Sequence, residues 1–145
     1  MGFLGTRAGP LADLALIISI AGFIILCLGV VYAKRGILLR HFKMTRLAVL
    51  LFVIAFIWMG PRFIGSVHII MARLAVLTAL PMLITVYHAV IGTFALLAGI
   101  FLGFDKVIKK TRYPMRAVFL LWILALLLGI VTYIMRYILT PFSLR

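Results

Sequence analysis

The sequence predicts an all-α integral membrane protein, a bundle of four transmembrane helices arranged as two helical hairpins. Three observations predict this fold: 67% hydrophobic residues, fifteen basic residues against two acidic ones, and long apolar stretches spaced along the chain. A soluble domain of 145 residues does not combine so large an apolar fraction with so few carboxylates. Membrane helices with basic ends do have this composition.

Four apolar stretches are each long enough to cross a hydrocarbon core about 30 Å thick, which requires roughly 20 residues of helix. They cover about 11–33, 47–66, 83–104 and 117–139. Short basic connections join the first stretch to the second and the third to the fourth, which predicts two hairpins in one domain covering 1–145. The strands of a β-barrel would alternate apolar and polar residues, and these stretches do not.

A less regular segment, residues 60–82, lies between the two predicted hairpins. Gly60-Pro61 and Pro81 bracket it, and proline breaks or kinks a helix. Apolar residues recur inside it at near-helical spacing with basic residues between them, which is typical of an amphipathic helix on the outer membrane surface. An extension of the second span beyond the membrane fits the same pattern, and both interpretations stay open here.

The basic residues predict the orientation of the bundle. Ten of the fifteen follow the first and third spans: Lys34, Arg35, Arg40, Lys43 and Arg46, then Lys106, Lys109, Lys110, Arg112 and Arg116. Because such loops stay in the cytoplasm, we expect both termini outside (N-out, C-out) in a multi-pass protein of the cytoplasmic membrane. Next to apolar spans, the net charge of +13 indicates contact with anionic lipid headgroups rather than with nucleic acid.

The scarcity of acidic side chains argues against an enzyme. Asp13 and Asp105 are the only carboxylate side chains, and they fall at opposite membrane faces, so they cannot form a catalytic pair. The chain also lacks a phosphate-binding glycine loop, a histidine-rich zinc motif and a nucleophile elbow. The sequence therefore predicts a non-catalytic protein.

The third predicted span carries a histidine and a stripe of small residues. Gly92, Ala95 and Gly99 follow His88 at helical spacing, and Gly103 extends the stripe. Small residues let another helix approach closely. A histidine one turn from a glycine also suits a b-type haem, because the imidazole ligates the iron and the glycine leaves room for the ring. Both interpretations explain the glycines.

His88 is the candidate ligand for haem or copper, since ionisable residues at membrane depth are costly and usually functional. A hydrogen-bonded structural histidine is the competing interpretation. A second haem ligand would have to be His68 or come from a partner protein, because His41 lies near the opposite membrane face. His41 and Met44, three residues apart, form a weak candidate copper pair if this stretch is helical.

Asp13 and Arg136 form a candidate structural ion pair. Both fall near the outer ends of their spans, the first and the fourth. An ion pair there would satisfy two charges at an apolar boundary.

The order of several short motifs resembles a known family. These are His-x-x-Met-Thr at 41–45, Met59-x-Pro61, His88-Ala89-x-x-Gly92 and the run Trp122…Gly129…Tyr133. Over about 11–139 the chain resembles the small membrane proteins grouped as domain of unknown function family 420.

The resemblance implies a four-helix bundle and, for some members, a link to the maturation of haem–copper terminal oxidases. It makes His41, Met44 and His88 the matching positions to test, without assigning them a ligand. The long apolar segment between the hairpins departs from the family and leaves the role of that surface undefined.

We therefore expect a non-catalytic accessory or assembly subunit of a membrane respiratory complex of the haem–copper oxidase type. It would contact other integral membrane subunits, such as those of a terminal oxidase, with the small-residue stripe as the docking face. One alternative is a b-type haem-binding electron-transfer subunit with His88 as axial ligand. The other is a purely structural subunit of a larger membrane complex.

Overall fold

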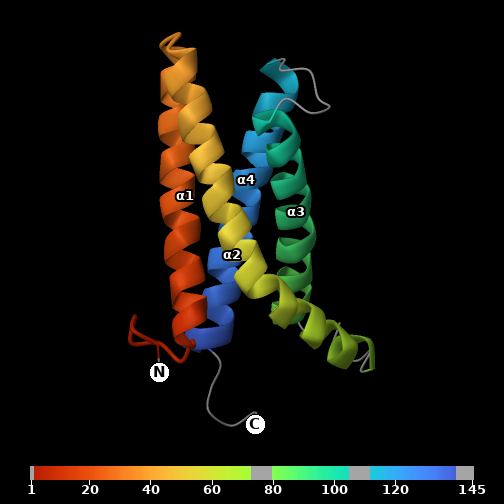
Figure 1. Cartoon of the computed structure of the whole chain (residues 1–145). Helices are drawn as coiled ribbons and strands as arrows, with labels where there is room; N and C mark the ends of the chain where they lie inside the picture. Colours follow the sequence, from red (N-terminus) through yellow and green to blue (C-terminus); the bar gives the residue numbers. More distant parts are fainter. Residues whose placement is uncertain (1, 73–79, 105–111, 140–145) are drawn as a thin grey trace.

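The computed structural model describes residues 2–72, 80–104 and 112–139. These residues form four long helices and one short π-helical segment: α1 (Pro10–Lys34), α2 (Leu38–Ala72), α3 (Leu80–Gly103), α4 (Arg112–Ile134) and η2 (Met135–Leu139). The described ranges contain no strand. The helices lie alongside one another as a bundle (Figure 1), which confirms the predicted all-α four-helix fold.

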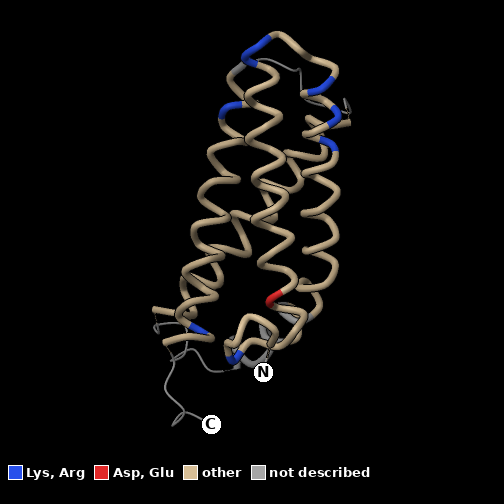
Figure 2. The backbone as a smooth tube through the Cα atoms, turned by 90° about the vertical axis from the view of Figure 1, so that its left-hand side faces the viewer, with Lys and Arg blue, Asp and Glu red and all other residues tan. Residues whose placement is uncertain are grey.

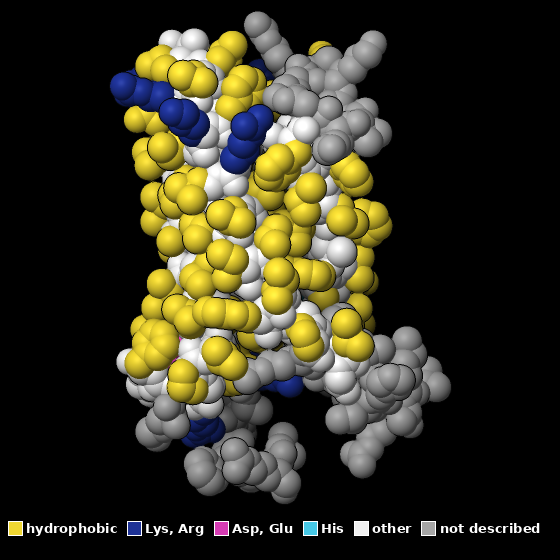
Figure 3. All heavy atoms as spheres, in the orientation of Figure 1, with side chains coloured by type: hydrophobic (Ala, Val, Ile, Leu, Met, Phe, Trp, Pro, Cys, Tyr) yellow, Lys and Arg dark blue, Asp and Glu magenta, His cyan; other side chains and the backbone are white. Residues whose placement is uncertain are grey.

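Each long helix contains a stretch long and apolar enough to cross a membrane. Large apolar side chains face outward on all four helices, for example Ile24, Ile57, Phe94 and Leu120, each of which is more than half exposed. On the face that Figure 3 shows, hydrophobic side chains predominate along the middle of the bundle. A surface of this kind is stable against lipid chains and not against water, so the chain is a multi-pass membrane protein.

The helices pair as predicted, α1 mainly with α2 and α3 mainly with α4. Pro10 occupies the first turn of α1, where its fixed φ suits a helix start. The turn into α2 contains Gly36 at a φ of 74°, a conformation that glycine adopts without strain. α2 then begins at Leu38, earlier than the predicted 47, because apolarity marks membrane depth while a helix continues through polar residues. The cluster Arg40 to Arg46 therefore lies on a helix rather than in a loop.

α2 continues through Pro61 to Ala72, so the described part of the segment between the hairpins extends the second span. Pro61 has no N–H to donate to the preceding turn, which is a common cause of a kink. The last turns of α2 diverge from the rest of the bundle (Figure 1). Residues 73–79, which complete the predicted segment, lie outside the described residues.

Stacked aromatic rings join the two hairpins at the centre of the bundle. Phe52 of α2 stacks on Trp122 of α4 with ring centroids 3.9 Å apart, and Phe23 of α1 stacks on Phe119 of α4 at 6.0 Å. The core around these rings consists of Leu26, Ala48, Phe52, Ala95, Leu96 and Trp122. α4 is therefore the helix through which the second hairpin contacts both helices of the first.

Charge is distributed unequally between the two ends of the bundle. Figure 2 shows most of the described basic residues at one end and the acidic residue toward the other. We call the end that carries the α1–α2 turn the basic end, and the end where α1 begins the Asp13 end. The predicted orientation places the basic end in the cytoplasm, because loops rich in Lys and Arg stay on that side.

Candidate functional site

Asp13 is the only acidic residue in the described ranges, and its side chain is fully buried, with 0% exposed. Its carboxyl group accepts three hydrogen bonds. The backbone N–H of Leu4 donates to Oδ2 at 2.9 Å, the Thr6 hydroxyl donates to Oδ1 at 3.4 Å, and the Tyr133 hydroxyl donates to Oδ1. The Thr6 and Tyr133 hydroxyls are themselves 2.7 Å apart. Such bonds offset the cost of burying a carboxyl group.

The Asp13 cluster, which consists of Leu4, Thr6, Asp13 and Tyr133, holds three parts of the chain together. The segment before α1 folds back over the start of that helix, and a side chain at Gly2 would overlap Oδ2 of Asp13. Tyr133 supplies the contact from α4 and packs with two buried alanines of the N-terminal region and α1. The cluster therefore fastens the N-terminal segment and α4 to α1.

Arg136, the predicted partner of Asp13, is not among the three donors that the structure shows. Tyr133 comes from the same helical stretch, three residues earlier, and its ring is buried while Arg136 is exposed. A phenol suits this place because its ring packs against apolar neighbours and its hydroxyl reaches the carboxyl group. The structure thus shows a contact between the ends of the first and fourth spans through Tyr133, and the Asp13–Arg136 ion pair stays a prediction.

His88 of α3 makes a hydrogen bond to the backbone of α4. Its Nδ1 lies 2.9 Å from the carbonyl oxygen of Ala125. A carbonyl only accepts hydrogen bonds, so Nδ1 carries the proton and donates it. The imidazole ring rests on Gly129, where a methyl group would lie 2.8 Å from Cε1 of His88. Gly129 is thus required for the position of His88; the sequence analysis named Gly129 as a motif position but did not connect it with His88.

The geometry of His88 also bears on its role as a ligand. Metal-binding histidines are commonly oriented by a bond from one ring nitrogen to a carbonyl, which leaves the other nitrogen for the metal. In His88 the remaining nitrogen is Nε2. Gly92, one turn along α3, has nothing within 4 Å of the position a methyl group would take. These two features fit one axial ligand beside open space.

A second ligand for His88 is not provided by the described residues. The side chain of His68 lies outside the part of the chain that the structure describes. Within that part, no group of three or more His, Cys, Asp or Glu side chains comes together. In the part of the chain that the structure describes, the candidate haem site is thus represented by His88.

His41 of α2 makes the same kind of bond as His88, at the basic end. Its Nδ1 donates to the carbonyl oxygen of Gly29 in α1 at 2.9 Å. Met44 lies on the same side of α2, with its Cβ 3.4 Å from the position of a methyl group on Gly29. The stretch is helical, as the candidate copper pair requires, and Nε2 of His41 and the sulfur of Met44 are the atoms that would bind the metal.

The small-residue stripe of α3 packs inside the chain's own bundle. Ala95 is fully buried, and a methyl group on Gly99 would lie 3.3 Å from the Trp122 ring. The carbonyl oxygen of Gly103 accepts a hydrogen bond from Nε of Arg46 in α2 at 3.1 Å. Three of the four predicted packing positions therefore face α2 and α4, and the docking face expected along this stripe is covered within the chain.

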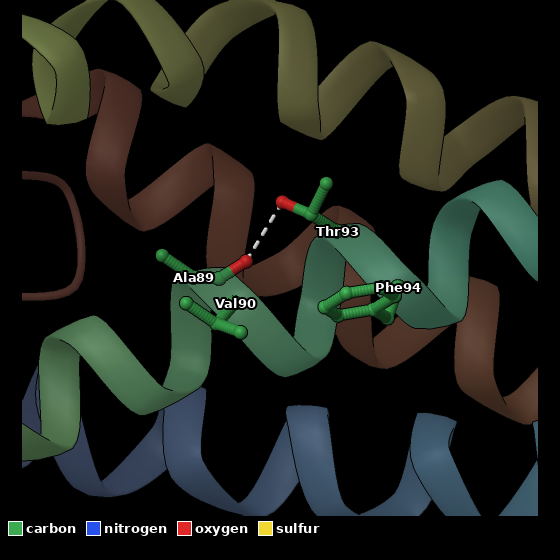
Figure 4. Close-up of a pocket in the computed structure, with 4 residues that line it drawn as sticks. All are labelled: Ala89, Val90, Thr93 and Phe94. Atoms are coloured by element: carbon green, nitrogen blue, oxygen red, sulfur yellow. Dashed lines mark hydrogen bonds between the residues drawn. The ribbon is translucent and has the colours of Figure 1, made fainter.

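A shallow, open depression lies on the outer surface of α3. Ala89, Val90, Thr93 and Phe94 line it (Figure 4). The Thr93 hydroxyl donates a hydrogen bond to the backbone carbonyl of Ala89 in the same helix, at 2.7 Å. The depression is mainly apolar and suits a hydrocarbon group better than a polar ligand.

The chain matches no protein-family model, no curated protein and no solved structure. The resemblance to domain of unknown function family 420 therefore stays a prediction based on the motifs quoted above.

We predict that Tyr133→Phe destabilises the protein by about 2 kcal/mol, because Asp13 loses a donor in a buried setting. Tyr113, which is 84% exposed, provides the matched control, and Tyr113→Phe should change stability by less than about 0.5 kcal/mol. The measurement is the free energy of unfolding in detergent micelles. Equal values for the two variants would contradict a stabilising role for the Asp13 cluster.

We predict that Gly129→Ala destabilises the protein by roughly 1–3 kcal/mol, because the added methyl group displaces the His88 ring. Gly92→Ala is the control: the space there is open, so the change should be neutral or stabilising. In a His88→Ala background the cost of Gly129→Ala should disappear. A cost that persists without the imidazole would show that His88 is not what Gly129 accommodates.

Proposed function

We propose that this protein is a non-catalytic accessory or assembly subunit of a membrane respiratory complex of the haem–copper oxidase type, located in the cytoplasmic membrane. The observation that supports a non-catalytic role is how its reactive side chains are used. Asp13, His41 and His88 each bond to a neighbouring helix or segment of the same chain. Groups used in this way stabilise a scaffold.

The respiratory part of the proposal rests on the motif resemblance, in which some family members are linked to oxidase maturation. The helix-contact part rests on the outer surface. Because the small-residue stripe faces inward, the surfaces left for contacts with other subunits are the outward apolar faces of the helices. The diverging end of α2 supports this, since Ile64 on it is more than 60% exposed, as is Ile57 just before Pro61.

Affinity purification from native membranes in a mild detergent tests the proposal. Subunits of a terminal oxidase should be recovered with the tagged protein and identified by mass spectrometry. A charged substitution on the diverging end of α2, Ile64→Asp, should reduce this recovery. Leu39→Asp is the control. Leu39 is exposed at the basic end, so a charge there should have no effect on the recovery. Recovery of the protein alone, without any respiratory subunit, would contradict the proposal.

A second candidate function is a b-type haem-binding electron-transfer subunit, favoured by the orientation of His88. The protein purified from its native membrane would then show a reduced α-band and a Soret band after addition of dithionite. His88→Ala should abolish both bands, and His41→Ala, which removes the equivalent bond at the basic end, should leave them unchanged. A colourless, metal-free protein would exclude this function, and the candidate copper pair of His41 and Met44 with it.

A purely structural subunit is the third candidate. In that case His88→Ala should lower the amount of assembled complex without changing any absorption band.

A further inference from the structure

A fixed guanidinium group stands where α2 and α3 meet at the basic end. Nε of Arg46 donates to the carbonyl oxygen of Gly103, the last residue of α3, at 3.1 Å. The guanidinium carbon also lies 5.9 Å from the centre of the Phe104 ring. Two contacts thus hold the group in place. Arginine has five N–H donors, so those not directed at Gly103 can bind an anion.

Positive charge at this place has no acidic counterpart in the described part of the chain. Lys43 lies one turn before Arg46 on α2, and both side chains are exposed. The one acidic residue of the described ranges, Asp13, is buried at the other end of the bundle. Lys43 and Arg46 therefore place two positive charges on neighbouring turns of α2 at this end, while Asp105, the other acidic residue of the sequence, lies outside the described residues.

An apolar track leads from Arg46 toward the middle of the membrane. Exposed residues follow one another along α3 at intervals of three or four positions and so share one face: Phe104, which directly follows the helix, and then Phe101, Leu97, Phe94 and Val90 within it. The track ends at the depression lined by Ala89, Val90, Thr93 and Phe94, where Thr93 points toward α2 (Figure 4). From Phe104 to Phe94 the helical rise gives about 15 Å. One leaflet of a hydrocarbon core about 30 Å thick has the same depth.

We propose that this face binds one anionic phospholipid from the leaflet at the basic end. Its phosphate lies against Arg46 and Lys43, and one acyl chain follows the α3 track into the depression. Basic pockets between transmembrane helices are known to take such headgroups. The site is independent of the proposed respiratory role, and it is more specific than general attraction of a basic surface to anionic lipid because it requires both the fixed guanidinium and the apolar depression.

Native mass spectrometry tests the site. The whole protein is transferred to micelles that contain equal amounts of phosphatidylglycerol and phosphatidylcholine with identical acyl chains. We expect the parent protein to retain one phosphatidylglycerol in preference to phosphatidylcholine. Arg46→Gln should reduce this preference about fivefold, the contribution of one basic residue near an anionic surface. Equal retention of the two lipids by the parent protein would overturn the proposal.

Two matched controls separate the site from general charge and surface effects. Arg116→Gln removes an exposed basic residue from α4 and should leave the lipid preference unchanged; a fivefold loss there too would overturn the proposal.

Thr93→Phe fills the depression without changing charge and should lower retention of the lipid. Leu120→Phe places the same ring at an exposed position of α4 and should not. Circular dichroism of each variant confirms that the helices are intact, and the ratio of the two lipids in one sample is independent of the amount of folded protein.

Discussion

The contact between a ring and a glycine on a facing helix is the interaction on which this bundle depends. Lipid chains are as apolar as leucine, so helices in a membrane gain little from burying apolar surface and associate through close packing and hydrogen bonds. Gly99 admits the Trp122 ring, and Gly129 admits the imidazole of His88. At the second contact the ring also donates a hydrogen bond to the α4 backbone, at Ala125. One glycine thus permits both the packing and the polar bond that association in lipid requires.

This use of polar groups decides where the protein can act on other molecules. The carboxyl group of Asp13 and the Nδ1 atoms of His41 and His88 are occupied by contacts that hold the helices together. What remains available lies outside the core: the apolar lipid-facing surface, the diverging end of α2 and the cations of the basic end. A chain organised in this way is suited to binding membrane components along its surface, which supports both the proposed accessory role and the proposed lipid site.

Hydropathy predicted the fold class and the four spans because the thickness of the bilayer fixes the length of any helix that crosses it. Hydropathy indicates how deep in the membrane a residue lies, but not toward which neighbouring helix its side chain points. It therefore brought Asp13 to the level of the outer end of the fourth span, and the structure shows that Tyr133 of that helix donates a bond to it. For the same reason it identified Ala95 and Gly99 as packing positions and assigned them to a partner, although Trp122 of the chain itself covers Gly99. The start of α2 at Leu38 was missed because helix ends depend on backbone hydrogen bonds, which apolarity does not record.

The two histidine bonds lie at different depths, and this accounts for the asymmetry of the bundle. His41 joins α2 to α1 at the basic end, whereas His88 joins α3 to α4 toward the Asp13 end. At the Asp13 end, α1 is bonded through Asp13 to Tyr133 of α4, and α2 diverges (Figure 1). α1 thus changes its principal bonded neighbour from α2 at one end to α4 at the other. Because α1 is bonded to α4 at that end, α2 can diverge beyond Pro61 while α1 stays fastened to the bundle.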